Sequence, residues 1–275
     1  MNRRQTLLVA AALAFASCGG GTPEPPALEY GHGPESELTY VRGDTTIVSL
    51  SMMGQSLEIE QRGVMSLGVT MSNTAAGADV RMSVLDLDAS ISNPMGAPMS
   101  FDETTVDGDV VFSLDRRGDA TVESLPTVSL EASQMVSATA LANGFFPGLP
   151  GGAPSPGESW VDTLTYESVD ASGLRSAEES ITTYTIVGPD TFEGRAVLRI
   201  ELSGTSSLSN EFDMQGMSLS QESDVEVEGH LLWDHQRGVM VERVQNSSGS
   251  GRVSGAPVPL PIEIESRQVT RLGGM

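Results

Sequence analysis

The stretch QESDVEVEGHLLW, residues 221–233, predicts the fold class of this chain from its alternating pattern. Acidic residues occupy every second position from Glu222 to Glu228, and Val225 and Val227 lie between them. Because successive side chains of a β-strand point to opposite faces, this alternation places the acids on one face and the apolar groups on the other. One solvated face is typical of an antiparallel sheet, since parallel sheets covered by helices show continuous apolar runs.

The same period of two recurs in residues 85–91, 196–202 and 262–265. Segments containing glycine, such as 116–119 and 234–238, separate the alternating runs and are typical of turns between strands. The sequence therefore predicts a mainly β protein built from antiparallel strands.

Between the two β-rich regions lie residues 128–157, VSLEASQMVSATALANGFFPGLPGGAPSPG. Apolar residues recur at intervals of three and four from Leu130 to Phe146, which predicts one amphipathic helix. The prolines and glycines that follow cannot continue a regular element, so they predict a hinge. We expect two similar curved antiparallel halves, at 37–127 and 158–275, joined through this central helix and hinge.

The two halves also resemble each other in sequence. Residues 95–123 can be laid over 215–242 with two single-residue gaps, which matches an Arg-Gly step at 117–118 with one at 237–238. In both segments an acidic strand leads into an apolar strand, which turns at Arg-Gly and returns to end in Glu. A duplication and convergent hairpin chemistry both explain this similarity.

The N-terminus, MNRRQTLLVAAALAFASC, predicts a lipoprotein signal peptide at residues 1–17. Its apolar run from Leu7 to Phe15 is too short to span a bilayer as a helix, which takes about 20 residues. Cys18 is the single cysteine of the chain and follows small residues, so we expect it to carry a lipid after cleavage. Ordinary secretory cleavage that leaves a free Cys18 is the alternative.

Residues 18–36 are rich in Gly, Pro and Glu and predict a disordered tether, because they carry too little apolar surface to fold. The formal net charge of the 275 residues is −22, and every basic residue is an arginine. Such a surface repels phosphate backbones, so we expect no nucleic-acid partner. With 5% aromatics and 13 methionines, the core is expected to consist of Val, Leu, Ile and Met.

The sequence lacks the common motifs of catalysis. It contains no HExxH and no G-x-S-x-G, and His230 and His235 lie five residues apart on a strand and in its turn, so a shared metal is not expected. Asp86 and Asp88 share a strand face, where solvation explains them and a calcium or glycosidase pair is the alternative. We expect no catalytic residue, no metal site and no cofactor.

A sharper hypothesis concerns the methionines. Their soft, unbranched side chains suit a cavity that accepts ligands of varied shape, whereas filling gaps in an aromatic-poor core is the alternative. The candidate ligand-lining residues are Met65, Met82, Met135, Leu141 and Phe145.

Several features together resemble a family of uncharacterised bacterial lipoproteins. They are the leader and tether, GDTTIVSLSMMGQSLEIEQ at 43–61, the helix before a Pro-rich run, GESW at 157–160 and the Arg-Gly hairpin. The arrangement is also similar, at the level of the fold, to periplasmic lipoprotein carriers in which a curved antiparallel sheet wraps a helix around an apolar cavity. The resemblance implies an exported protein anchored through Cys18, and the lack of Asp after Cys18 favours the outer membrane.

The sequence therefore predicts a lipid-anchored, non-enzymatic envelope protein that binds an apolar ligand, such as a lipid, or another envelope protein. Two alternatives stay open. One is a structural or protein-binding surface lipoprotein without a ligand pocket, and the other is a hydrolase that uses carboxylates.

Overall fold

A computed structural model of the chain describes residues 27–31, 36–52, 55–92, 94, 96–129, 132–169, 175–214, 217–255 and 259–273. Cys18, the predicted signal peptide and most of the predicted tether lie outside the described residues.

The described residues form fourteen strands and one α-helix. The strands are β1 (Ser36–Met52), β2 (Gln55–Asn73), β3 (Gly77–Ser92), β4 (Met99–Asp102), β5 (Val106–Asp107), β6 (Val110–Asp115), β7 (Ala120–Ser124), β8 (Thr127–Val128), β9 (Ser159–Val169), β10 (Arg175–Phe192), β11 (Arg195–Met214), β12 (Met217–Asp234), β13 (Val239–Ser254) and β14 (Leu260–Leu272). The helix is α1 (Ala138–Gly144), and short 3-10 turns lie at Glu103–Thr105 and Ala132–Gln134.

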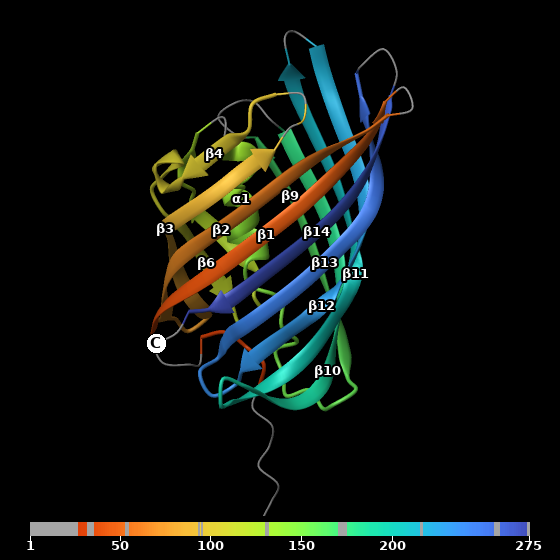
Figure 1. Ribbon diagram of the computed structural model, residues 1–275. Coiled ribbons are helices and arrows are strands. Elements are labelled where there is room, and N and C mark those ends of the chain that lie inside the picture. Colours follow the sequence, from red (N-terminus) through yellow and green to blue (C-terminus); the bar gives the residue numbers. More distant parts are fainter. Residues whose placement is uncertain are drawn as a thin grey trace, which may run out of the picture.

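One antiparallel sheet contains twelve of these strands (Figure 1). Its order is β7-β6-β3-β2-β1-β14-β13-β12-β11-β10-β9, with β4 beside β3, and β5 and β8 pair separately. β1 and β14 pair from Tyr40 opposite Leu272 to Leu50 opposite Ile262. The two halves of the sequence therefore join side by side in one continuous sheet, and the prediction of a mainly β, antiparallel fold is confirmed.

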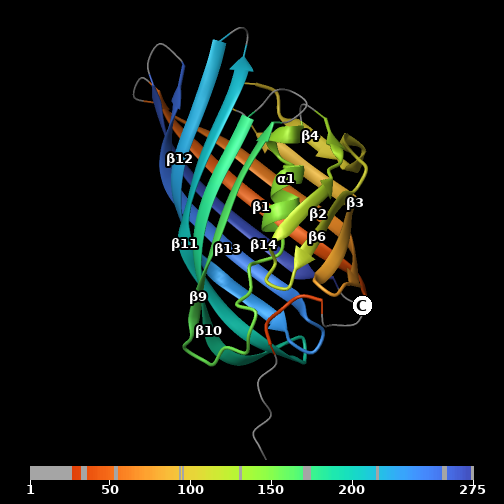
Figure 2. The same cartoon turned by 180° about the vertical axis from the view of Figure 1, so that it is seen from behind.

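The sheet curls around α1 (Figure 2). Its two end strands, β7 and β9, do not pair with each other within the described part of the chain, but both contact α1. The helix also contacts β6. It therefore lies on the inner face of the sheet, between the two edges.

The alternation predicted for residues 221–233 is also confirmed. Glu222, Asp224, Glu226 and Glu228 are exposed, whereas Val227 between them is half-buried and packs against the core. The acids of β12 thus lie on the outer face of the sheet, and its apolar residues face the inside of the curl.

Glycines on the inner face permit the tight curl of the sheet. A Cβ on Gly229 would overlap the carbonyl oxygen of Val244, and one on Gly249 would overlap that of Asp224, each on the neighbouring strand. Only glycine tolerates so close an approach of two backbones. These positions let β12 and β13 coil more strongly than side chains would allow.

The central helix is shorter than predicted. Instead of one helix from Leu130 to Phe146, α1 begins after Ser137, whose Oγ accepts a hydrogen bond from the Ala140 N–H at 3.1 Å. Leu130 lies outside the described residues. A serine that caps the backbone in this way starts a helix rather than continuing one, so the apolar periodicity upstream of Ser137 belongs to a separate short turn.

Aromatic side chains fill the centre of the core, although few occur in the sequence. Ring centroids lie 5.2 Å apart for Tyr40 and Phe145, 4.9 Å for Phe145 and Phe146, and 5.4 Å for Tyr30 and Trp233. The paired rings meet edge to face, an arrangement that stabilises beyond the area buried. Aromatic rings therefore add to the aliphatic residues and methionines expected there.

Part of the predicted tether is packed in the structure. Leu28 and Tyr30 are buried, and the Tyr30 hydroxyl donates a hydrogen bond to the Pro147 carbonyl at 2.9 Å. The Leu28 N–H donates to the Gly152 carbonyl at 2.6 Å. Residues 27–31 therefore differ from the expected disorder, because two isolated apolar side chains dock onto the Pro/Gly segment after α1.

Candidate functional site

Four polar side chains form an array on the inner face of the sheet. Arg42 and Asp44 come from β1, Gln268 from β14 and Arg243 from β13. Arg42 and Asp44 lie two and four residues after Tyr40, which is fully buried, so they point to the same inner face. The register places Asp44 opposite Gln268.

Hydrogen bonds link the four side chains. Arg42 Nε donates to Asp44 Oδ2 at 2.8 Å, and Gln268 Nε2 donates to Asp44 Oδ1 at 2.9 Å. Arg243 Nη2 donates to Gln268 Oε1 at 3.2 Å. One carboxylate therefore serves two guanidinium groups, the first directly and the second through an amide.

Arg243 connects the array to the helix. Its Nη1 donates to the Gly144 carbonyl at 2.9 Å, which places a positive charge at the C-terminus of α1. Burial lowers the pKa of Arg243, and the nearby Arg42 lowers it further, while Asp44 opposes this. Within the described residues, Arg243 Nε and the fully buried hydroxyl of the adjacent Thr270 have no hydrogen-bond partner.

A second polar group lies on β9, β10 and β11. Tyr166 donates its hydroxyl to Glu178 Oε2 at 2.7 Å, and Ser206 donates to Glu178 Oε1 at 3.0 Å. Burial raises the pKa of Tyr166, Glu178 raises it further, and Arg42 opposes the shift. Arg42 thus acts on Tyr166 although five strands of the sheet separate β1 from β9, because the curl turns their inner faces toward each other.

From the array toward the strand ends at Met52 and Ser254, the inner face of β1 and β14 becomes apolar. The alternation from Arg42 and Asp44 assigns Val48 and Leu50 to this face, opposite Ile264 and Ile262 of β14. Ile262 is 2% exposed and Ile264 is 9% exposed, whereas the other apolar residues here are half-buried. Those half-buried residues include Val48, Leu50, Leu57, Ile59, Leu164, Leu208 and Val225.

Small residues share this part of the inner face with the apolar ones. They are Ser180, Gly204, Ser206, Ser223, Ser247, Gly249, Gly251 and Ser266. Small side chains occupy less of the interior than large ones would. Apart from the array and the group around Glu178, the described part of this surface is therefore lined by apolar and small side chains.

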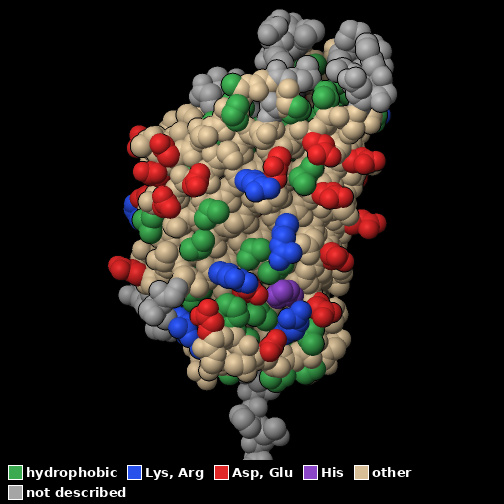
Figure 3. All heavy atoms as spheres, in the orientation of Figure 1, with side chains coloured by type: hydrophobic (Ala, Val, Ile, Leu, Met, Phe, Trp, Pro, Cys, Tyr) green, Lys and Arg blue, Asp and Glu red, His purple; other side chains and the backbone are tan. Residues whose placement is uncertain are grey.

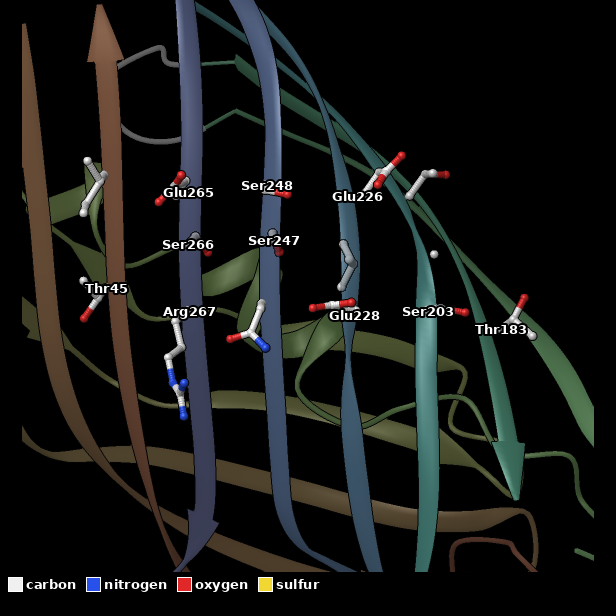
Figure 4. A pocket seen from close by; sticks show the side chains of 15 residues that line it. Thr45, Thr183, Ser203, Glu226, Glu228, Ser247, Ser248, Glu265, Ser266 and Arg267 are labelled. Carbon is white, nitrogen blue, oxygen red and sulfur yellow. The ribbon is translucent and has the colours of Figure 1, made fainter. Parts of the chain in front are cut away.

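The outer face carries a shallow groove of about 790 Å³ (Figure 4). Its lining includes a row of polar residues across neighbouring strands, in which Thr45 lies opposite Arg267, Asn246 opposite Glu228, and Glu228 opposite Ser203. Glu226 and Glu265 add acidic groups. Figure 3 shows acids spread over this side of the molecule, with arginines nearer its middle.

The methionines and helix residues expected to line a ligand site lie in or beside the hydrophobic core. Met65, Met82, Leu141 and Phe145 are buried members of the core cluster, and Met135 packs against it partly buried. None of the five lines the outer groove. Their role in ligand binding stays a prediction.

The clustered histidines are not brought together. His230 Nε2 lies 3.0 Å from Glu242 Oε1, while Arg271 Nε contacts Glu242 Oε2, and His235 lies in the turn after β12. Burial raises the pKa of Glu242, but the bonds from His230 and Arg271 outweigh it, so the pKa lies below its ordinary value. In the described part of the chain, no three His, Cys, Asp or Glu side chains are placed to hold a metal ion.

Sequence reasoning missed the inner array. The sequence did contain a pattern that indicates the array. Arg42 and Asp44 follow Leu38 and Tyr40 at intervals of two, so they lie on the same face of the strand as these apolar residues. Charged side chains on the buried phase of a strand are costly unless they are paired, so they mark a special site. Arg243 could not be found in this way, because its contact with α1 depends on the curl.

The fold defines the class of the protein as all-β, with one curled antiparallel sheet around a short helix. Comparison with family models finds no match, and no curated protein matches the sequence. Among solved structures, the crystal structure of Pseudomonas aeruginosa OpdQ aligns over 86% of this chain and 97% of that chain, at 7% identity and a TM-score of 0.26. So loose a superposition carries no argument. No helix within the described ranges is long and apolar enough to cross a membrane.

Proposed function

We propose that the protein is a lipid-anchored, non-enzymatic envelope protein that binds an apolar ligand on the inner face of its curled sheet. The observation that supports the proposal is the half-buried stretch beyond the array, where Val48, Leu50 and Val225 stand among serines and glycines. Half-buried apolar side chains on an inward face are the surface that an apolar ligand would cover. Cys18 is the proposed site of the lipid anchor, and the envelope is the proposed location.

The proposal is tested by placing a large side chain on the inner face, in the space that the ligand would occupy. Ser247 and Ser248 are neighbours on β13; Ser247 is half-buried opposite Val227 on the inner face, and Ser248 is exposed opposite Glu226. Ser247→Phe should reduce binding of an environment-sensitive fluorescent fatty acid about tenfold or more, because the ring occupies the space of the ligand. Ser248→Phe adds the same ring to the outer face and should leave binding unchanged. Equal affinities in both variants and the parent would contradict the proposal.

A second candidate is a surface lipoprotein that binds another envelope protein. The outer groove favours it, since Glu226, Glu228 and Glu265 present an acidic surface to a basic partner. Glu226→Lys together with Glu228→Lys would abolish capture of such a partner while leaving fatty-acid binding intact. The two functions are therefore separable by experiment.

A further inference from the structure

Two arginines on the inner face depend on one carboxylate. Arg42 reaches Asp44 directly, and Arg243 reaches it through Gln268. A buried guanidinium is stable when a carboxylate or several acceptors satisfy it, and an unmatched one is costly. Among the described residues, Asp44 is therefore the one carboxylate to which both arginines are linked by hydrogen bonds.

The other inward acids are engaged elsewhere. Asp162 accepts the Gly148 N–H at 3.0 Å, and burial raises its pKa, which favours the neutral form. Glu178 accepts the hydroxyls of Tyr166 and Ser206. Neither acid is bonded to an arginine of the array within the described residues.

The two arginines also keep unused donors. Arg243 Nη1 donates to the Gly144 carbonyl at the end of α1, but the buried Nε of Arg243 has no partner among the described residues. Arg42 donates through Nε to Asp44, and no described acceptor bonds its two Nη nitrogens. Its side chain is 21% exposed, so a ligand on the inner face can reach it. A planar guanidinium with both Nη groups free matches the two oxygens of a carboxylate.

We propose that Arg42 binds the carboxylate of an amphiphile, such as a fatty acid, whose chain lies along the apolar inner face. Arg243 adds a second positive charge near the head group. The chain runs beside Val48 and Leu50, and the eight residue steps from Arg42 to Leu50 extend over about 26 Å at the usual rise of a strand. This inference rests on the proposed function and names the class of ligand for the same surface.

The test compares two probes of equal chain length, dodecanoate and dodecanol, titrated calorimetrically into the full-length protein below their aggregation limits. The parent protein should bind dodecanoate about 10- to 100-fold more tightly, as expected for hydrogen bonds to a charged group. Arg42→Gln should remove this preference and leave the affinity for dodecanol unchanged. Arg62→Gln is the matched control, because Arg62 lies on the adjacent strand β2 but is exposed and pairs with Glu60; the preference should persist.

The outcomes separate the two levels of the proposal. Equal binding of acid and alcohol by the parent protein would overturn the head-group assignment while leaving the apolar-ligand function standing. Binding of neither probe would overturn both. The comparison in the parent protein decides the question even if Arg42→Gln does not fold.

Discussion

At the scale of single residues, Glu242 shows how an acid can be held on the outer face with 7% of its side chain exposed. Burial raises its pKa, but the bonds from His230 and Arg271 lower it by more. When folding lowers the pKa of a carboxyl group, that group stabilises the folded state fully at pH values above its pKa in the unfolded chain. This contribution is lost as the pH falls through the pKa of the folded state.

We therefore predict that the free energy of unfolding decreases as the pH falls from about 5 to about 3, and that part of the decrease comes from Glu242. Glu242→Gln should be less stable than the parent at neutral pH, and the difference should shrink toward acid pH. Urea unfolding at a series of pH values measures this. A difference that is constant with pH would show that the ion pairs of Glu242 do not stabilise the fold.

The phase of β12 gives a second prediction at this scale. Val227→Asp places a charge on the inner face against the core and should cost about 1–3 kcal/mol, whereas Glu226→Val changes an exposed outer residue and should be nearly neutral. Chemical denaturation measures both variants. Equal costs would mean that the faces of the strand are assigned wrongly.

At the scale of elements, the glycines of β12 and β13 set the curl of the sheet. Gly229→Ala should destabilise by about 1–3 kcal/mol, because its methyl group would overlap the carbonyl oxygen of Val244. Gly43→Ala on β1 is the control, since no atom lies within 4 Å of its added Cβ. Thermal unfolding should separate the two variants, and a loss of the same size in both would rule out a role for close strand approach at Gly229.

The helix offers a second test at this scale. Leu141 is 3% exposed in a filled part of the core, so Leu141→Ala should cost about 2–5 kcal/mol through lost burial and a new void. It should leave fatty-acid binding unchanged, because the proposed ligand surface lies beyond the array. A small cost together with altered binding would instead place the ligand at α1, as the sequence predicts.

Sequence periodicity predicts the strands better than the central helix. The alternation of Glu226 and Val227 predicts one solvated face directly, because neighbouring residues of a strand point to opposite faces and a short stretch is enough to show it. The apolar spacing before Ser137 has helical period too, yet the serine cap divides the segment. The inner array of Arg42, Asp44, Gln268 and Arg243 could not be predicted for another reason. Arg243 contacts Gly144 only when the sheet has curled, and no local sequence pattern encodes a contact between residues 99 positions apart.

At the scale of the whole molecule, the N-terminal segment fixes how an anchored protein would stand on a membrane. Leu28 is held beside Gly152, at the end of the sheet opposite the strand ends at Met52 and Ser254. A lipid on Cys18 would be ten residues away, so this end could stand at most about 35 Å from the anchor. The apolar part of the inner face then lies toward the far end, away from the membrane.

Anchoring itself is tested by Cys18→Ala. The variant should move from the detergent phase to the aqueous phase on fractionation, because Cys18 is the proposed site of the acyl chains. Its circular dichroism should match that of the parent protein. Retention in the detergent phase would contradict lipidation at Cys18.

Native mass spectrometry of the Cys18→Ala protein purified from its own envelope tests whether the inner face holds a ligand, because no anchor then adds to the mass. Ligand binding on the inner face predicts a mass above that of the polypeptide by one amphiphile per chain, and loss of this increment when Ser247→Phe is added. A mass equal to the polypeptide alone, or an increment that persists with Ser247→Phe, would contradict ligand binding on the inner face of the sheet.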